Sequence, residues 1–181
     1  LVRYRPAMPD VLVSRQGTLS EMLGDGLVVR FGAPTSRHDD ALRAVRCAVE
    51  MQQQLASFNA QEGLSLEMGI GIGTGNVIAG NIGSRKRMKY GVVGTPINLA
   101  GRLESCAVGS QIFIDDVTRS LVGDEIQFGE MLELRPKGWP EPIRCHPVQA
   151  AGDIDMPEQT IIFSWRPTDL SSRCWQIEDK A

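Results

Sequence analysis

The stretch that most constrains this chain is MLGDGLVVRFG, which spans residues 22–32. Its Gly-Asp-Gly triplet stands between two apolar runs. Glycine and aspartate in that position are the strongest short-range signal for a β-hairpin, because a tight turn needs backbone conformations that most residues adopt only at a cost. We therefore predict strands at 18–22 and 27–31, with the carboxylate of Asp25 presented at the turn between them.

The rest of the chain alternates irregularly between strand and helix patterns. Residues 64–74 place apolar side chains at every second position, which is the period of a strand. Helices are predicted from Asp39 and from Thr95, because each precedes apolar residues at helical spacing. Further strands are expected at 90–93, 112–114, 126–134 and 143–148, with short helices at 10–16 and 115–122. Helices that mix irregularly with hairpins favour an α+β fold.

Composition excludes several classes of function. The chain has 181 residues, of which 42% are hydrophobic, and this suits one domain with a packed core. A net charge of −3 gives no basic field for bulk nucleic-acid binding. The 4 cysteines form no Cys-x-x-Cys pair and only 2 histidines accompany them, so we expect reduced thiols and no zinc site. No apolar run is long enough to span a membrane.

The glycine-rich run MGIGIGTGNVIAGNIGS at residues 68–84 invites comparison with nucleotide-binding loops. A Rossmann fingerprint needs glycines at i, i+2 and i+5, and counting from Gly69, Gly71 or Gly73 the third position is never glycine. Gly75 and Gly80 have the spacing of a P-loop, but Asn-Ile follows where Lys-Ser/Thr is required. We therefore interpret the run as small residues that let two backbones approach closely.

Two polar features suit phosphate binding without requiring it. Asn98 and Arg102 are four residues apart and share one face of a predicted helix. The guanidinium of arginine offers a planar set of donors for a phosphate, and asparagine can hold a hydroxyl group from either side. The basic segment 85–89 could contact phosphates or form a solvated hairpin. Taken alone, each feature is ordinary on a protein surface.

Taken in order, these motifs resemble the catalytic domain of class III adenylyl and guanylyl cyclases. The resemblance is carried by GTLSEMLGDGLVVRFGAP, MGIGIGTGNVIAGNIGSRKRMKYGVVGTPINLAGRLES and ELRPKGWPEPI, and it covers residues 10–149 without large gaps. It implies a ferredoxin-like α+β fold with a mostly antiparallel sheet. We expect that sheet to contain both the 18–31 hairpin and the 64–74 strand, with helices 39–60 and 95–106 on one face. The basic segment resembles the dimerisation arm of the family.

The resemblance also implies a reaction, in which a phosphorus–oxygen lyase joins the ribose 3′-oxygen of a nucleotide to its α-phosphorus and expels pyrophosphate. Two Mg²⁺ or Mn²⁺ ions assist. Asp25 matches one of the two aspartates that hold these ions. Asn98 matches the residue that orients the ribose, Arg102 the one that stabilises the transition state, and Lys137 a ligand of the terminal phosphates. In the family these groups come from two chains, so a homodimer with shared active sites is implied.

The sequence departs from the family pattern in three ways. The other metal-binding aspartate belongs to an opening strand that would precede residue 1, so we expect a catalytic domain at 1–149 that lacks this strand and a tail at 150–181. Adenylyl cyclases usually carry lysine where this chain has Glu21. A glutamate there accepts hydrogen bonds from guanine, as in guanylyl cyclases. The third departure is Gly91, where the family has a side chain that reads the base.

The sequence therefore predicts a nucleotide cyclase of intracellular signalling, located in the cytoplasm alone or as part of a larger protein. Nearness to the bacterial adenylyl cyclases favours the conversion of ATP to cyclic AMP. Three alternatives stay open: a guanylyl cyclase that makes cyclic GMP, a degenerate cyclase-homology domain that acts in dimerisation or regulation, and an unrelated ferredoxin-like domain. The expected partners are ATP or GTP and a second copy of the chain.

Overall fold

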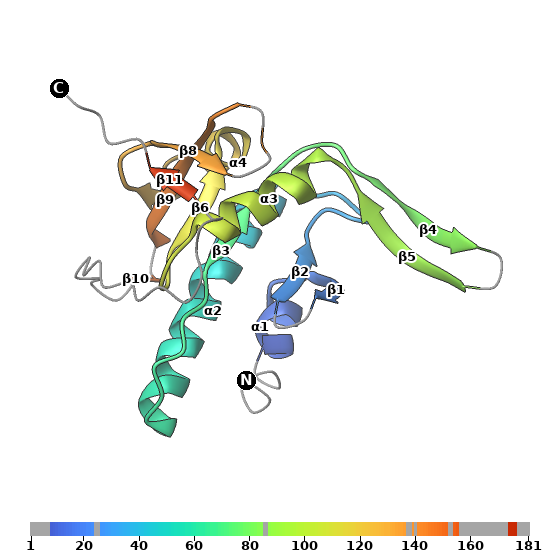
Figure 1. Cartoon of the computed structure of the whole chain (residues 1–181). Helices are drawn as coiled ribbons and strands as arrows, with labels where there is room; N and C mark the ends of the chain where they lie inside the picture. The colour runs from blue at the N-terminus through green and yellow to red at the C-terminus, as the bar shows by residue number, and fades with distance from the viewer. Residues whose placement is uncertain are drawn as a thin grey trace.

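The computed structural model describes residues 8–23, 26–84, 87–136, 139, 141–151, 154–155 and 174–176 (Figure 1). Its helices are α1 (Met8–Ser14), α2 (Asp40–Glu62), α3 (Thr95–Cys106) and α4 (Asp116–Val122), the last followed by a short 3-10 turn, η1 (Gly123–Glu125). Its strands are β1 (Thr18–Leu23), β2 (Gly26–Arg30), β3 (Ile70–Ile72), β4 (Ile78–Ser84), β5 (Arg87–Val93), β6 (Ile112–Asp115), β7 (Ile126–Phe128), β8 (Leu132–Pro136), β9 (Ile143–Ala151), β10 (Ile154–Asp155) and β11 (Cys174–Gln176). The prediction of an α+β fold is confirmed.

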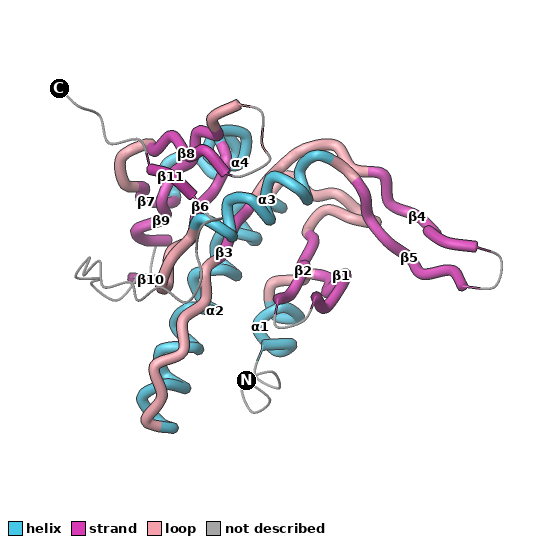
Figure 2. The backbone as a smooth tube through the Cα atoms, in the orientation of Figure 1, coloured by secondary structure: helices cyan, strands magenta, loops and turns pink. Residues whose placement is uncertain are grey.

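The largest sheet has seven strands and forms the main body of the fold. Its order is β11-β8-β9-β6-β3, and β7 and β10 also pair with β9. Only the described pair β3 and β6 runs parallel, so the sheet is mostly antiparallel, as predicted. The antiparallel pair β4 and β5 forms a long arm that projects from this body (Figures 1 and 2). Strand β5 contains Arg87 and Lys89 of the basic segment that the sequence assigned to dimerisation, and Arg85 and Lys86 lie outside the described residues.

The prediction that the 18–31 hairpin and the 64–74 strand share one sheet is wrong. The hairpin strands β1 and β2 form a two-stranded sheet of their own, whereas β3 belongs to the large sheet. The strand predicted at 64–74 is also shorter than expected, since only Ile70–Ile72 pairs as a strand.

Side chains of α2 explain why β3 is short. Asn59 donates through Nδ2 to the carbonyl of Leu66 at 2.8 Å and accepts from the Leu66 amide through Oδ1 at 3.1 Å. Gln52 donates to the carbonyl of Met68. The helix thus satisfies backbone groups that a neighbouring strand would otherwise bond, and the segment 64–69 runs extended along α2 without sheet pairing.

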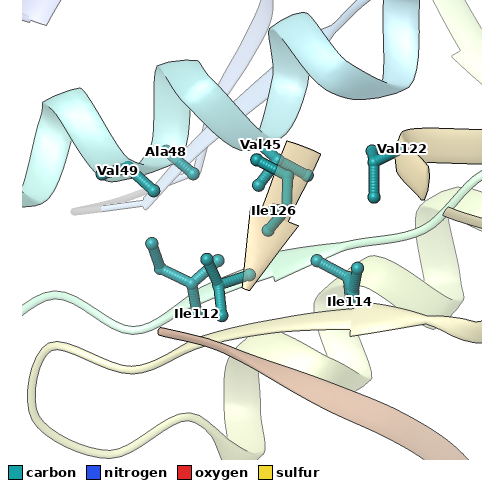
Figure 3. Close-up of a cluster of buried hydrophobic side chains, with 8 residues drawn as sticks. Val45, Ala48, Val49, Ile112, Ile114, Val122 and Ile126 are labelled. Atoms are coloured by element: carbon teal, nitrogen blue, oxygen red, sulfur yellow. The ribbon is translucent and has the colours of Figure 1, made fainter. Parts of the chain in front are cut away.

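Helices cover both faces of the large sheet. Successive residues of a strand point to opposite faces, so one strand can contact helices on both sides. On β6, Ile112 and Ile114 pack with α2 and α4, while the intervening Phe113 packs with Leu103 of α3. The expectation that both long helices cover one face is therefore wrong. Figure 3 shows the cluster on the α2 face, whose buried members are Val45, Ala48, Val49, Ile112, Ile114, Val122, Ile126 and Val148. Burying each of the larger side chains contributes about 1.5–3 kcal/mol.

Other local predictions need smaller changes. The strand predicted at 126–134 is interrupted near Gly129, and its two parts, β7 and β8, pair with successive parts of β9. The amide of Gly129 donates to the carbonyl of Pro147 at 2.9 Å across this interruption. The helix predicted at 115–122 is confirmed as α4. The strand-like piece QTIIFSW in the tail lies outside the described residues, and the division at residue 149 stays a prediction.

The cysteines differ in state. Cys47 and Cys145 are free and buried. Burial raises the pKa of the Cys47 thiol to about 11, with help from the Glu50 carboxylate. Burial likewise raises the pKa of the Cys145 thiol to about 12, with help from Asp116. Cys106 is disulfide-bonded, so the expectation of a fully reduced set of thiols is wrong.

We expect Cys47 and Cys145 to resist iodoacetamide at pH 8 in the native protein. The thiolate is the reactive form, and both raised pKa values keep these thiols protonated and shielded at that pH. Peptide mass spectrometry after alkylation checks this, and alkylation in urea, where both sites should react, provides the control. Rapid labelling of either residue in the folded chain would contradict the buried, protonated state.

Candidate active site

Helix α3 carries the two polar residues that the sequence singled out. It begins at Thr95 with a proline in its first turn, where the fixed φ of proline suits a helix and its missing N–H leaves no bond unmade. Leu103 and Cys106 are buried against the sheet, whereas Asn98 and Arg102 are exposed. The helix thus presents Asn98 and Arg102 together on its outer side, as the four-residue spacing predicts.

Glycines allow α3 to lie unusually close to the large sheet. A Cβ atom added to Gly71 of β3 would lie 2.1 Å from the carbonyl oxygen of Ala100 and 2.3 Å from the amide nitrogen of Glu104. Gly69 and Gly73 flank β3. A Cβ on Gly69 would lie 2.4 Å from the carbonyl oxygen of Ala107, which follows α3, and a Cβ on Gly73 would lie 2.8 Å from the carbonyl oxygen of Pro96 in α3. We call these three residues the glycine face. The prediction that this run lets two backbones approach closely is confirmed.

Of the remaining candidates, Glu21 and Asp25 belong to the hairpin, which the structure describes only in part. Glu21 pairs with Val28 across β1 and β2, next to a register shift, and its side chain lies outside the description. Asp25 also lies outside, although Leu23 and Gly26 on either side of the turn are paired in register. Lys137 lies outside the described residues as well. The roles of these three side chains stay predictions.

Gly91 lies in β5, in register with Gly80 of β4, at the body end of the arm. Strand β1, which contains Glu21, comes close to β5. The two positions that the resemblance assigns to the base thus belong to neighbouring strands of one chain. Asn98 and Arg102 belong to a different element, α3, and a site shared between two copies stays a prediction.

The described residues provide no metal site by themselves. Within those ranges, no three His, Cys, Asp or Glu side chains come together as a metal ion would require. The resemblance assigns Asp25 to metal binding, and one carboxylate is too few ligands for two divalent ions. Asp25 lies outside the described residues, so metal binding stays a prediction.

Sequence reasoning missed one polar cluster beside the candidate site. Asp115 and Thr118 are buried, and they contact Thr74 in the loop that follows β3. Asp115 caps α4 by accepting a hydrogen bond from the Thr118 amide at 2.9 Å. An aspartate three residues before a threonine at a predicted helix start is the signal that could have identified this pair.

The α+β fold, with its mostly antiparallel sheet, is the one that the resemblance to nucleotide cyclases implies. Residues 8–149 match the family described as "Adenylate and Guanylate cyclase catalytic domain". The chain belongs to this family, and the resemblance noted in the sequence is confirmed.

Solved structures of the family are close in fold. One described as the guanylyl cyclase Cya2 is 47% identical, with a TM-score of 0.79 and coverage of 85% of this chain and 82% of that one. The adenylyl cyclase CyaB from P. aeruginosa is 30% identical, with a TM-score of 0.79 and coverage of 84% and 81%. These structures include both kinds of cyclase.

Among curated proteins, "Adenylate cyclase 1" of Rhizobium meliloti (strain 1021) is 26% identical over 144 residues. The match covers 76% of this chain and 22% of that protein, so the matched part spans about a fifth of the length of this relative. In the part of the chain that the structure describes, no helix combines the length and apolar character needed to cross a bilayer.

Proposed function

We propose that this chain is a nucleotide cyclase domain that converts GTP to cyclic GMP and pyrophosphate, acting as a homodimer in signal transduction. This changes the preference for ATP that the sequence alone suggested. The observation that carries the proposal is Glu21 at the base-reading position, in a chain 47% identical to a structure described as a guanylyl cyclase.

The choice of base follows from matching donors with acceptors. The carboxylate of Glu21 only accepts hydrogen bonds at neutral pH. Guanine presents two donors on this edge, its N1–H and its amino group, whereas adenine presents an unprotonated N1 that would face the carboxylate as a second acceptor. Gly91 has no side chain that could provide a compensating donor. The pair thus favours guanine over adenine.

ATP is the second candidate, on the evidence of similarity. The 30% identity with the adenylyl cyclase CyaB and the match with Adenylate cyclase 1 favour it. Both are less similar to this chain than Cya2 is. A degenerate domain is the third candidate, and it leaves the presence of Asn98, Arg102 and Lys137 without a physical reason.

In the proposed reaction, the ribose 3′-hydroxyl releases its proton to water and its oxygen forms a bond to the α-phosphorus. The bond from that phosphorus to the bridging oxygen breaks, so pyrophosphate leaves. Asn98 would orient the ribose by hydrogen bonding. The exposed guanidinium of Arg102 would stabilise the negative charge that develops on the phosphate oxygens. Lys137 would hold the terminal phosphates. Each role is assigned by family resemblance to a residue of this chain.

The family implies two Mg²⁺ or Mn²⁺ ions, and Asp25 is the only ligand for them that the resemblance finds in this sequence. Because these donors are too few, we assign no step of the reaction to a metal. We propose instead that the chain gains full activity when an opening strand with a second aspartate precedes it. In the described part, β2 pairs only with β1 and β3 only with β6, so each has an edge at which a strand could add.

The test of this function measures cyclic nucleotides directly. The chain and a version extended at its N-terminus by such a strand are incubated with GTP or ATP and Mn²⁺, and products are separated by chromatography. We expect slow turnover by the chain itself, and fast formation of cyclic GMP by the extended protein. If the extended protein dimerises but makes neither cyclic nucleotide, the degenerate alternative holds.

Replacing Glu21 with lysine should shift the preference of the extended protein from GTP towards ATP. Lysine donates to the adenine N1 and leaves guanine with unmatched donors, and a mismatch of this kind costs about 1–3 kcal/mol when buried. The ratio of kcat/KM for the two nucleotides measures the shift. An unchanged ratio in Glu21→Lys would show that Glu21 does not contact the base.

A further inference from the structure

A chain of hydrogen bonds connects the start of α4 to the loop after β3. Thr118 is 0% exposed and Asp115 is 5% exposed, so both are shielded from water. The hydroxyl of Thr118 donates to Oδ1 of Asp115 at 2.5 Å, and the hydroxyls of Thr74 and Thr118 lie 2.7 Å apart. The Thr74 amide also approaches both carboxylate oxygens of Asp115 at 3.4 Å. Residues far apart in sequence are thereby joined through one buried carboxylate.

The direction of these bonds follows from the chemistry of the groups. A hydroxyl has one proton to donate, and that of Thr118 goes to the carboxylate of Asp115, which only accepts when ionised. The Thr74 hydroxyl must therefore donate to the oxygen of Thr118. Thr74 is the outer end of the chain, and removing its hydroxyl leaves the bonds between Thr118 and Asp115 intact.

Thr74 lies between two glycines that touch the first turn of α3. A Cβ added to Gly73 would lie 2.8 Å from the carbonyl oxygen of Pro96, and one added to Gly75 would lie 2.7 Å from the Pro96 side chain. The loop is therefore in close contact with the helix two residues before Asn98. A shift of the loop at Thr74 would move the start of α3, because no empty space separates them.

Helix α4 does not need Thr74. Asp115 caps α4 through the Thr118 amide, and this bond involves residues of the helix and its own cap alone. The additional bond to Thr74 thus fixes the loop rather than α4.

We propose that Thr74 is a positioning residue, which sets the place of Asn98 and Arg102 by holding the loop at residues 73–75 against the first turn of α3. This inference rests on the proposed function, because it depends on the catalytic roles of Asn98 and Arg102 and assigns no chemistry to Thr74 itself. Errors of about 1 Å in the placement of reacting groups can reduce turnover by up to two orders of magnitude. The Thr74 hydroxyl adds a bond of 2.7 Å to the longer contacts of 3.4 Å that the Thr74 amide makes with Asp115, and its loss is expected to affect rate more than binding.

The first test needs no catalysis. Thr74→Val keeps the branched shape and removes the hydroxyl, and Thr74→Ser restores a hydroxyl. Hydrogen exchange of peptides that cover residues 95–106 is measured by mass spectrometry on the chain as it is. We expect exchange roughly 2- to 10-fold faster in Thr74→Val, in line with the loss of one hydrogen bond, and near-normal exchange in Thr74→Ser. Unchanged exchange in Thr74→Val overturns the proposal.

The second test uses cyclase kinetics of the extended protein. Thr74→Val should lower kcat about 10-fold with KM changed by less than about twofold, and Thr74→Ser should recover most of the loss. Ser120→Ala removes an exposed hydroxyl that bonds within α4 and is the matched control, with no effect expected on kcat or exchange. An unchanged kcat in Thr74→Val overturns the positioning role. If the unsubstituted extended protein is inactive, the proposed function fails, and the exchange result alone decides the role of Thr74.

Discussion

Replacing Arg102 with alanine in the extended protein is expected to lower kcat by about 100-fold or more, with a much smaller change in KM. The physical reason is that the interaction between the guanidinium and the phosphate oxygens becomes stronger as the reaction approaches its transition state. Negative charge on the phosphate oxygens increases as the bond to pyrophosphate breaks, so a fixed positive group stabilises the transition state more than the bound nucleotide. Arg102 is exposed on α3 and is always charged, which suits that role. Steady-state kinetics with the preferred nucleotide measure the effect.

Arg102→Lys provides the matched variant, because it keeps the charge and loses the planar set of donors. We expect activity between those of the unsubstituted protein and Arg102→Ala. Thermal unfolding of the same variants checks that the exposed substitution leaves the fold intact. A rise in KM at constant kcat would instead show that Arg102 binds substrate and transition state equally, and the proposed role would be wrong.

The same variant tests whether sites are shared between two chains. Asp25→Ala and Arg102→Ala should each be nearly inactive, because each damages a different half of every site. In a mixture, heterodimers contain one site in which both halves are intact, so part of the activity should return. Heterodimer formation is followed by affinity tags on the two chains. Heterodimers that remain as inactive as either variant would exclude the composite site.

The sequence predicted those elements that local chemistry determines. The hairpin follows from the glycines around Asp25, and the start of α3 follows from Thr95 and Pro96, whose preferences need no distant partner. The shared outer face of Asn98 and Arg102 follows from helical spacing alone. These features were correct because each depends on a few neighbouring residues.

The features that were wrong or missed depend on contacts between distant segments. Alternation at 64–74 gives a period but no information about partners, and the side chains of Gln52 and Asn59 bond this backbone in place of a strand. The second helix-covered face was missed because the glycine face has no apolar side chains to count. The bond between Thr74 and Thr118 joins residues 44 positions apart, a separation for which no spacing rule exists.

Replacing Gly71 with alanine is expected to destabilise the fold by about 1–3 kcal/mol, the usual cost of adding a methyl group to a closely packed interior. The new Cβ would lie 2.1 Å from the carbonyl oxygen of Ala100 and 2.3 Å from the amide nitrogen of Glu104. Both are backbone atoms of α3, so no side-chain rotation relieves the contact and the whole helix must move away from β3. Urea unfolding measures the loss in free energy of unfolding, and Gly71→Val should lose more.

Gly80→Ala is the matched control, because an added Cβ at Gly80 in β4 meets nothing within 4 Å. Substituting alanine for an unstrained glycine reduces the entropy of the unfolded chain and typically stabilises by about 0.4–1 kcal/mol. Gly71→Ala reduces the entropy of the unfolded chain in the same way. A lower free energy of unfolding in Gly71→Ala, with no decrease in Gly80→Ala, therefore isolates the contact with α3. Equal stability of the two variants would show that α3 can move away from β3 without cost. In that case the glycine face would not determine where Asn98 and Arg102 lie.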